Sequence, residues 1–164
     1  NRIAAMLHAA DCLSKFGALG VAAFFTNSAL RGRTMRSSVL GYLSKELTYA
    51  ACLPLNMRTK AGRRLAAGKA SDSLKFYRSL LAELRGSGIA DLRVRRVRIP
   101  YPSAARRSIE VHFVISSACP ECGGEWEMAW ATDQGVKCNR LNINWACARC
   151  GEQVETSFCL PEIA

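Results

Sequence analysis

The sequence lacks the features of a membrane protein and of a common enzyme. Its longest nearly unbroken apolar run, Gly17 to Phe25, is far shorter than the roughly 18 residues that a membrane-spanning helix needs. Histidine is scarce, and His8 and His112 each stand alone in an amphipathic segment. No carboxylate pair, Ser-His-Asp order or glycine-rich phosphate loop accompanies them. We therefore predict no membrane partner and no enzymatic activity, and we assign no catalytic residue.

Acidic residues are also few. Thirteen Asp and Glu stand against 23 Lys and Arg, so the net charge is +10, and most of the excess is arginine. The planar guanidinium group suits phosphates and guanine edges better than an ammonium group does. Because the basic residues are spread over several segments, a nucleic acid is a better expected partner than a membrane surface. A ribosome or an acidic protein would fit this charge equally well.

Apolar residues at helical spacing predict that the first half of the chain is helical. They recur on one side of residues 2–16 and at every fourth position from Met35 to Leu47. A short helical run after Gly20 is separated from the second of these patterns by the turn "NSALRGR". A short helix, a tight turn and a helix with basic residues at its start are typical of a helix-turn-helix, here over about residues 18–48.

A basic arm, another helix and two strands are predicted next. The stretch "LPLNMRTKAGRRLAAGKAS" is basic and rich in glycine, and Ser71 or Ser73 after it can cap a helix. The stretch "DLRVRRVRIPYP" alternates apolar residues with arginine, as an edge strand does before Pro100. Residues 109–115 alternate in the same way, although a helix over residues 104–115 is an open alternative.

Four of the eight cysteines form two Cys-x-x-Cys-Gly pairs, in "CPECGG" and "CARCGE". Zinc prefers four thiolate or imidazole ligands in a tetrahedron, and each such pair can present two sulfurs to one ion. The 24 residues between the pairs are enough for a hairpin. We therefore predict a structural zinc ion, with no open position for catalysis, in a zinc ribbon. The predicted ligands are Cys119, Cys122, Cys147 and Cys150.

Other uses of these cysteines are open alternatives. Two disulfides would fit a secreted chain, and an iron centre would use the same four sulfurs. Cys138 lies between the two pairs and could replace a ligand, although we expect it to be an ordinary packed residue. The paired spacing favours a reducing, cytoplasmic location over a disulfide framework.

The order of these features resembles the FlhC family, the C subunit of the flagellar master transcription activator, and its plasmid-borne relatives. "CLSKFGALGVAAFFTNSALRGRTMRSSVLGYLSKEL" is similar to the family's "L-x-x-L-G-A-R…T-x-L-S-x-x-x-L…L-Y-K-E-L" stretch. Leu53 and Pro54 fall where the family has a Leu-Pro, and "CPECGG" matches its "C-x-x-C-G-G". The arginine that follows Gly-Ala in the family is Leu19 here. The resemblance implies a zinc-containing subunit that binds promoter DNA with a D-type partner and recruits RNA polymerase.

We thus predict a mainly α fold with a helix-turn-helix, plus a small C-terminal β zinc ribbon. Its expected parts are a helical domain over residues 1–88, a basic connector over residues 89–108 and the zinc ribbon over residues 109–164. The predicted function is a zinc-containing transcription regulator that binds double-stranded DNA, an activator subunit working with a partner subunit. The alternatives are an RNA-binding or ribosome-associated zinc-ribbon protein, or a structural subunit of a larger complex.

The residues expected to contact the nucleic acid are basic or carry a hydroxyl group. They are Arg31, Arg33, Arg36, Ser37, Arg58, Lys60, Arg63, Arg64, Arg93, Arg95, Arg96 and Arg98. Phosphate neutralisation by these side chains would supply affinity that falls steeply as salt is added.

Overall fold

The structure, a computed structural model, describes residues 2–102, 104–134, 138–161 and 163; side chains are described for these except 2, 35–41, 104–106 and 134. Within this part, four α-helices come first: α1 (Arg2–Ser14), α2 (Gly17–Leu30), α3 (Met35–Cys52) and α4 (Lys60–Gly86), with a short 3₁₀ turn, η1 (Leu53–Asn56), before α4. Five strands follow: β1 (Leu92–Tyr101), β2 (Ala104–Ser116), β3 (Trp126–Gln134), β4 (Asn139–Cys147) and β5 (Gln153–Cys159).

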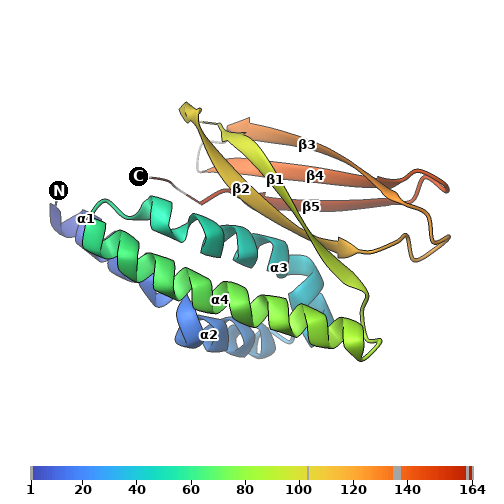
Figure 1. Cartoon of the computed structure of the whole chain (residues 1–164), viewed down its shortest axis with the longest axis horizontal. Helices are drawn as coiled ribbons and strands as arrows, with labels where there is room; N and C mark the ends of the chain where they lie inside the picture. Colours follow the sequence, from blue (N-terminus) through green and yellow to red (C-terminus); the bar gives the residue numbers. More distant parts are fainter. Residues whose placement is uncertain (1, 103, 135–137, 162, 164) are drawn as a thin grey trace.

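The strands form two antiparallel sheets, and the smaller one is the middle layer of the molecule. β1 pairs with β2, while β3, β4 and β5 form a three-stranded sheet with β4 at its centre. Figure 1 shows the β1–β2 ribbon between the helices and this three-stranded sheet. One face of the ribbon buries Val111 and Phe113 in the same cluster as Ile143 of β4. The opposite face buries Val114 with Leu47 of α3.

The prediction of a mainly α protein with a small appended zinc ribbon is therefore wrong. Residues 92–101, which fall in the predicted basic connector, form strand β1, and the alternative of a helix over residues 104–115 is wrong because β2 occupies them. Their alternating pattern was sufficient to indicate strands. It did not indicate that both faces of the resulting ribbon are covered, which makes the strands part of the central core rather than a linker.

Helix α3 covers the edge of β2 that β1 leaves open. The hydroxyl oxygen of Ser44 accepts a hydrogen bond from the backbone N–H of Val114 at 2.9 Å, and that of Thr48 accepts one from the N–H of His112 at 3.0 Å. Four helical residues advance about 6 Å and two strand residues about 6.8 Å, so the two spacings nearly match. These buried hydroxyls therefore supply the hydrogen bonds that another strand would supply.

This packing limits which part of α3 could act as the recognition helix of the predicted helix-turn-helix. α2 and α3 are joined by a short turn, in the order that the sequence predicted. A recognition helix must expose one face to enter a DNA groove. From Tyr42 to Cys52, however, no described side chain of α3 is fully exposed, and Leu43 and Leu47 are completely buried. The described part of α3 is a core helix, wedged between α4 and β2.

Candidate metal centre

The two Cys-x-x-Cys pairs fold into turns of the same construction. The first connects β2 to β3 and the second connects β4 to β5. In each turn, the N–H of the glycine four residues on donates to the carbonyl oxygen of the first cysteine, at 2.8 Å for Gly123 and 2.9 Å for Gly151. Both glycines have a positive φ, +71° and +78°, which side chains disfavour. A positive φ therefore explains why a glycine follows each Cys-x-x-Cys pair in the sequence.

The four sulfurs converge on one point. All lie within 4.8 Å of one another, and Cys119 and Cys147 are buried. The closest pairs join different turns: the Sγ atoms of Cys119 and Cys150 are 3.7 Å apart, and those of Cys122 and Cys147 are 3.4 Å apart. Four sulfurs bound tetrahedrally at about 2.3 Å from an ion are themselves about 3.8 Å apart. The cluster could therefore hold a metal ion without a large rearrangement of the chain.

Gly124 packs directly against this cluster. A methyl group at this position would lie 2.8 Å from the Sγ of Cys147 and 3.2 Å from the Sγ of Cys122. Atoms at such distances overlap, so the second glycine of "CPECGG" is required by space rather than by backbone conformation. The carbonyl oxygen of Gly124 also accepts a hydrogen bond from the N–H of Cys119 at 2.9 Å, which connects the two ends of the turn.

Hydrogen bonds favour a thiolate at Cys147. The backbone N–H of Cys150 is the main cause that lowers the pKa of Cys147 to about 6; desolvation opposes it and the N–H of Arg149 adds to it. The guanidinium group of Arg149 donates to the carbonyl oxygen of Cys122 at 3.0 Å, so a positive charge lies beside the cluster. A thiolate is the form that binds metal, and these donors therefore favour that form at Cys147.

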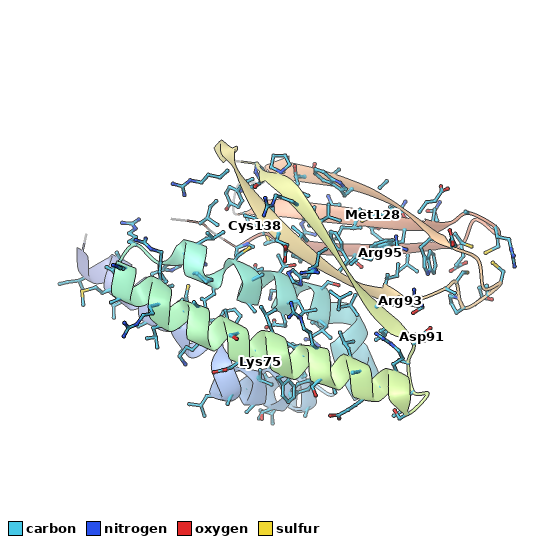
Figure 2. The ribbon with its side chains drawn as sticks, viewed as in Figure 1. Lys75, Asp91, Arg93, Arg95, Met128 and Cys138 are labelled. Atoms are coloured by element: carbon cyan, nitrogen blue, oxygen red, sulfur yellow. A yellow bond between two sulfur atoms is a disulfide. The ribbon has the colours of Figure 1, made fainter. Side chains whose placement is uncertain are left out.

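Cys138, the alternative ligand, lies elsewhere. It forms a disulfide with Cys159, just before β4 and at the end of β5. Figure 2 shows Cys138 at the end of the three-stranded sheet opposite the loops that carry the four cysteines. Sequence reasoning missed this bond because Cys138 and Cys159 belong to no spacing pattern that indicates a disulfide. The pairing depends on the register that places Cys159 opposite Arg140.

The basic residues predicted to contact nucleic acid fall into three groups. Arg31 and Arg33 lie at the α2–α3 turn, where Arg33 stacks 4.1 Å from the ring centre of Tyr42. The side chains of Arg36 and Ser37 are outside the described residues. A second group, exposed at the start of α4, consists of Arg58, Lys60, Arg63 and Arg64. The third group, exposed along β1, consists of Arg93, Arg95, Arg96 and Arg98.

Further basic residues on α4, among them Arg78 and Arg85, were missed by sequence reasoning. These two and the predicted Arg64 are all exposed and stand 14 and seven positions apart, so they share one side of the helix. This row approaches β1: a terminal nitrogen of Arg85 donates to the carbonyl oxygen of Leu92 at 2.8 Å. Arg78 and Arg96 both lie close enough to His112 to lower its pKa, after burial as the main cause. The repeat of seven in the sequence was the signal that could have found this row.

The charge of the chain is divided between two regions. Residues 1–116 contain 20 Lys and Arg and six Asp and Glu, a net charge of +14. Residues 117–164 contain three and seven, a net charge of −4. The cysteine centre and the three-stranded sheet thus belong to an acidic region, and a divalent ion held by four thiolates would add two more negative charges to it. Anionic partners are therefore expected at the helices and β1.

The helices α1 and α2 present apolar side chains to solvent. Leu19 and Leu30 on α2 are each 80% exposed, and Ile3 and Leu7 on α1 are each 67% exposed. Among the described residues, no helix is by itself long and apolar enough to cross a bilayer. Only α1 and α2 taken together, bent by 73° at their junction, reach that limit, and only by length and composition. We call these exposed apolar residues of the two helices the α1–α2 face.

Comparison with known proteins adds no relative. No protein-family model, no curated protein and no solved structure matches this chain. The resemblance to the FlhC family therefore stays a prediction. The geometry of the sulfurs and the distribution of charge are the observations on which a functional proposal can be built.

Proposed function

We propose that this protein is a zinc-stabilised regulator that binds double-stranded DNA through its basic helical region. Zinc is the favoured metal because four thiolates in two Cys-x-x-Cys turns form the closed tetrahedral site that structural zinc prefers. Zinc bound there would hold the β2–β3 and β4–β5 turns together. Since all four positions are taken by protein sulfurs, the ion has a structural role and takes part in no reaction.

The observation that carries the DNA proposal is the segregation of charge. The basic region has a net charge of +14, and its α4 arginine row meets the start of β1 at Arg85, which donates to the carbonyl oxygen of Leu92. Figure 2 labels Lys75 on α4 and Arg93 and Arg95 on β1; Arg95 lies on the face of β1 toward the three-stranded sheet, where its guanidinium is 5.7 Å from the ring centre of Trp145. Guanidinium groups held on two neighbouring rigid elements can contact successive phosphates of a duplex. We call this surface, formed by Arg64, Lys75, Arg78, Arg85, Arg96 and Arg98, the α4–β1 basic face.

This proposal changes the mode of binding that the sequence suggested. The described part of α3 is buried, so the contacts are to the phosphate backbone from α4 and β1 rather than to base edges from a recognition helix. The acidic sheet would be repelled by the duplex and would point away from it. A partner subunit or RNA polymerase would then meet the sheet or the apolar α1–α2 face, as the wider proposal of an activator subunit requires.

A salt series on matched variants tests the DNA proposal. We expect Arg78→Ala combined with Arg96→Ala to weaken binding to a labelled duplex, and to reduce the slope of log affinity against log salt by about 2, roughly 0.9 for each lost phosphate contact. Arg140→Ala is the matched control, because Arg140 is exposed on the acidic sheet and bonds to Ser157. Its salt slope should equal that of the unchanged protein.

Structured RNA is measured in the same series. Tighter binding to RNA than to duplex DNA at every salt concentration would replace DNA by RNA as the target. Equal losses in the Arg140 variant and in the α4–β1 variant would show that total charge, not this face, determines binding. Stoichiometric zinc, measured by elemental analysis of the same preparations, tests the metal separately.

A second candidate function is that of a structural subunit in a larger complex. It is favoured by the exposed apolar residues of α1 and α2, because isolated soluble chains seldom leave such a surface uncovered. Light scattering of the isolated chain tests it. Concentration-dependent association that Leu19→Ser and Leu30→Ser abolish would support this role, whereas a monomer at all concentrations would contradict it.

A further inference from the structure

The sulfur chemistry of this chain has two parts, placed at the two ends of one hairpin. Cys147 and Cys150 lie at the turn between β4 and β5, where the four-cysteine centre forms. Cys138 and Cys159 lie at the open end of the same hairpin and form a disulfide. The disulfide closes a loop with a sequence separation of 21 residues, and that loop contains half of the metal ligands.

We propose that the Cys138–Cys159 disulfide is a redox clasp that sets the affinity of the four-cysteine centre for its metal. The inference rests on the zinc binding proposed above. When the disulfide is intact, the hairpin stays closed at its open end even without metal. When it is reduced, the metal-free hairpin gains conformational freedom, which metal binding must then remove.

The size of the effect follows from loop closure. Closing a loop of about 20 residues restricts a fully unfolded hairpin by an amount equivalent to about 250-fold in an equilibrium constant. The metal-free hairpin keeps part of its packing, since Ile143 and Leu141 of β4 are buried against β2. We therefore expect the oxidised protein to bind zinc between about tenfold and about 250-fold more tightly than the reduced protein.

Metal binding explains why one group of cysteines can be oxidised while the other stays reduced. Burial alone does not protect the four-cysteine centre, because Cys150 is exposed and Cys122 is half-buried, as Cys138 and Cys159 are. Thiolates bound to a divalent ion are poorer nucleophiles than free thiolates, so the metal protects its own ligands. Glutathione disulfide supplies the oxidising equivalents: two protein thiols and one glutathione disulfide give one protein disulfide and two glutathione thiols.

The clasp also joins the acidic sheet to the helices. The hydroxyl group of Tyr49 on α3 donates to the carbonyl oxygen of Cys159 at 2.6 Å, and the N–H of Leu160 donates to the carbonyl oxygen of Asn139 at 2.7 Å. Fraying of the open end after reduction would therefore loosen the contact between β5 and α3. The oxidation state of Cys138 and Cys159 would thus change both the metal affinity of the four-cysteine centre and the contact between β5 and α3.

The test compares zinc affinity in defined redox states of the full chain. Zinc is first bound, the protein is treated with glutathione disulfide, and mass spectrometry confirms the loss of two hydrogens. Affinity is then measured by competition with a chromophoric chelator, before and after removal of the disulfide with a phosphine reductant. The double variant Cys138→Ser, Cys159→Ser is measured in parallel. Cys12→Ser, a change on α1 that leaves both sulfur groups intact, is the matched control.

We expect the oxidised chain and oxidised Cys12→Ser to bind zinc at least about tenfold more tightly than the reduced chain. The double variant should match the reduced chain and should not respond to glutathione disulfide. By linkage, zinc should make the disulfide harder to reduce by the same factor. Equal zinc affinity in the two redox states would overturn the clasp and leave the zinc centre intact. Absence of stoichiometric zinc in both states would instead overturn the zinc centre itself.

Discussion

The basic helical region and the acidic three-stranded sheet are stabilised in different ways. The helices and the β1–β2 ribbon enclose large apolar clusters, with Leu43, Leu47 and Tyr77 almost fully buried. The three-stranded sheet buries one face on the ribbon, but its other face is polar and lies in solvent. A cysteine centre and a disulfide lie at the opposite ends of this sheet. These sites cross-link its strands in addition to the apolar cluster that it shares with the ribbon.

The two regions can be observed separately. The three tryptophans of the chain, Trp126, Trp130 and Trp145, all lie on β3 and β4, whereas the described α-helices all lie in the basic region. Tryptophan fluorescence therefore reports on the three-stranded sheet. The helical signal in circular dichroism reports on the basic helical region of residues 1–116, which we call the body. Variants that affect one region only should change one signal only.

The largest effect is expected from removing one of the four proposed zinc ligands. Cys119→Ser should weaken zinc binding by more than about a hundredfold, because losing a ligand costs more than losing an outer-shell partner. Tryptophan fluorescence should shift to the red as the sheet opens, while the helical signal stays close to that of the unchanged protein. Cys12→Ser is the control and should change neither. A parallel loss of helix in Cys119→Ser would show that the two regions unfold together.

A smaller effect on the same centre is expected from Gly124→Ala. The added methyl group overlaps the sulfurs of Cys147 and Cys122, so the turn must move and zinc affinity should fall about 10- to 100-fold. Chelator competition measures this change. Gly68→Ala on α4 is the matched control, since nothing lies within 4 Å of its new methyl group. It should leave zinc affinity unchanged and stabilise the body by up to about 1 kcal/mol. An unchanged zinc affinity in Gly124→Ala would contradict the packing of this turn.

The body should respond to changes at the α3–β2 edge. Thr48→Val keeps the shape of the side chain but leaves the buried N–H of His112 without its acceptor, so the free energy of unfolding should fall by about 1–3 kcal/mol. Urea unfolding followed by the helical signal measures it. Thr26→Val on the exposed side of α2 should lie within about 0.5 kcal/mol of the unchanged protein. A similar decrease in the free energy of unfolding in both variants would contradict the proposed role of the Thr48 hydroxyl.

The smallest effect concerns pH. Burial is the main cause that lowers the pKa of His112; the Glu110 carboxylate, 2.8 Å from its Nε2, opposes this, and Arg78 and Arg96 add to it. The unfolded chain, with an ordinary pKa of about 6.5, then binds a proton that the folded chain does not. Stability is therefore complete above about pH 6.5 and falls below it, by at most about 1.4 kcal/mol per pH unit.

His112→Asn should flatten this part of the pH profile, measured as the difference from the unchanged protein in urea unfolding at about pH 5.5 and about pH 7.5. His8→Asn, a change at an exposed histidine on α1, is the control and should keep the full slope. If the slope survives in His112→Asn, another group must be responsible for it.

Local patterns were enough to predict part of this structure. The two Cys-x-x-Cys-Gly pairs predicted the four residues that converge, because a ligand pair and its turn glycine lie next to one another in sequence. The alternation in residues 92–101 indicated a strand in the same way. In both cases the physical cause acts over a few residues.

The rest depends on contacts between distant residues. Nothing local indicates that the Ser44 hydroxyl meets Val114, 70 residues away, or that residues 42–52 of α3 pack into the core. The Cys138–Cys159 bond and the proximity of α4 to β1 depend on register and packing in the same way. The division of charge at residue 117 could have been found by counting, and it directs attention from α3 to the α4–β1 basic face.

The hydroxyl groups of α3 have a consequence for the order in which the chain is assembled. A chain is made from its N-terminus at about 5–20 residues per second, so α3 exists for several seconds before β2 emerges. When His112 and Val114 appear, Thr48 and Ser44 are already available to them. The edge of β2 therefore finds hydrogen-bond acceptors on a helix that has already formed. The time during which this unpaired edge could pair with another nascent chain is short.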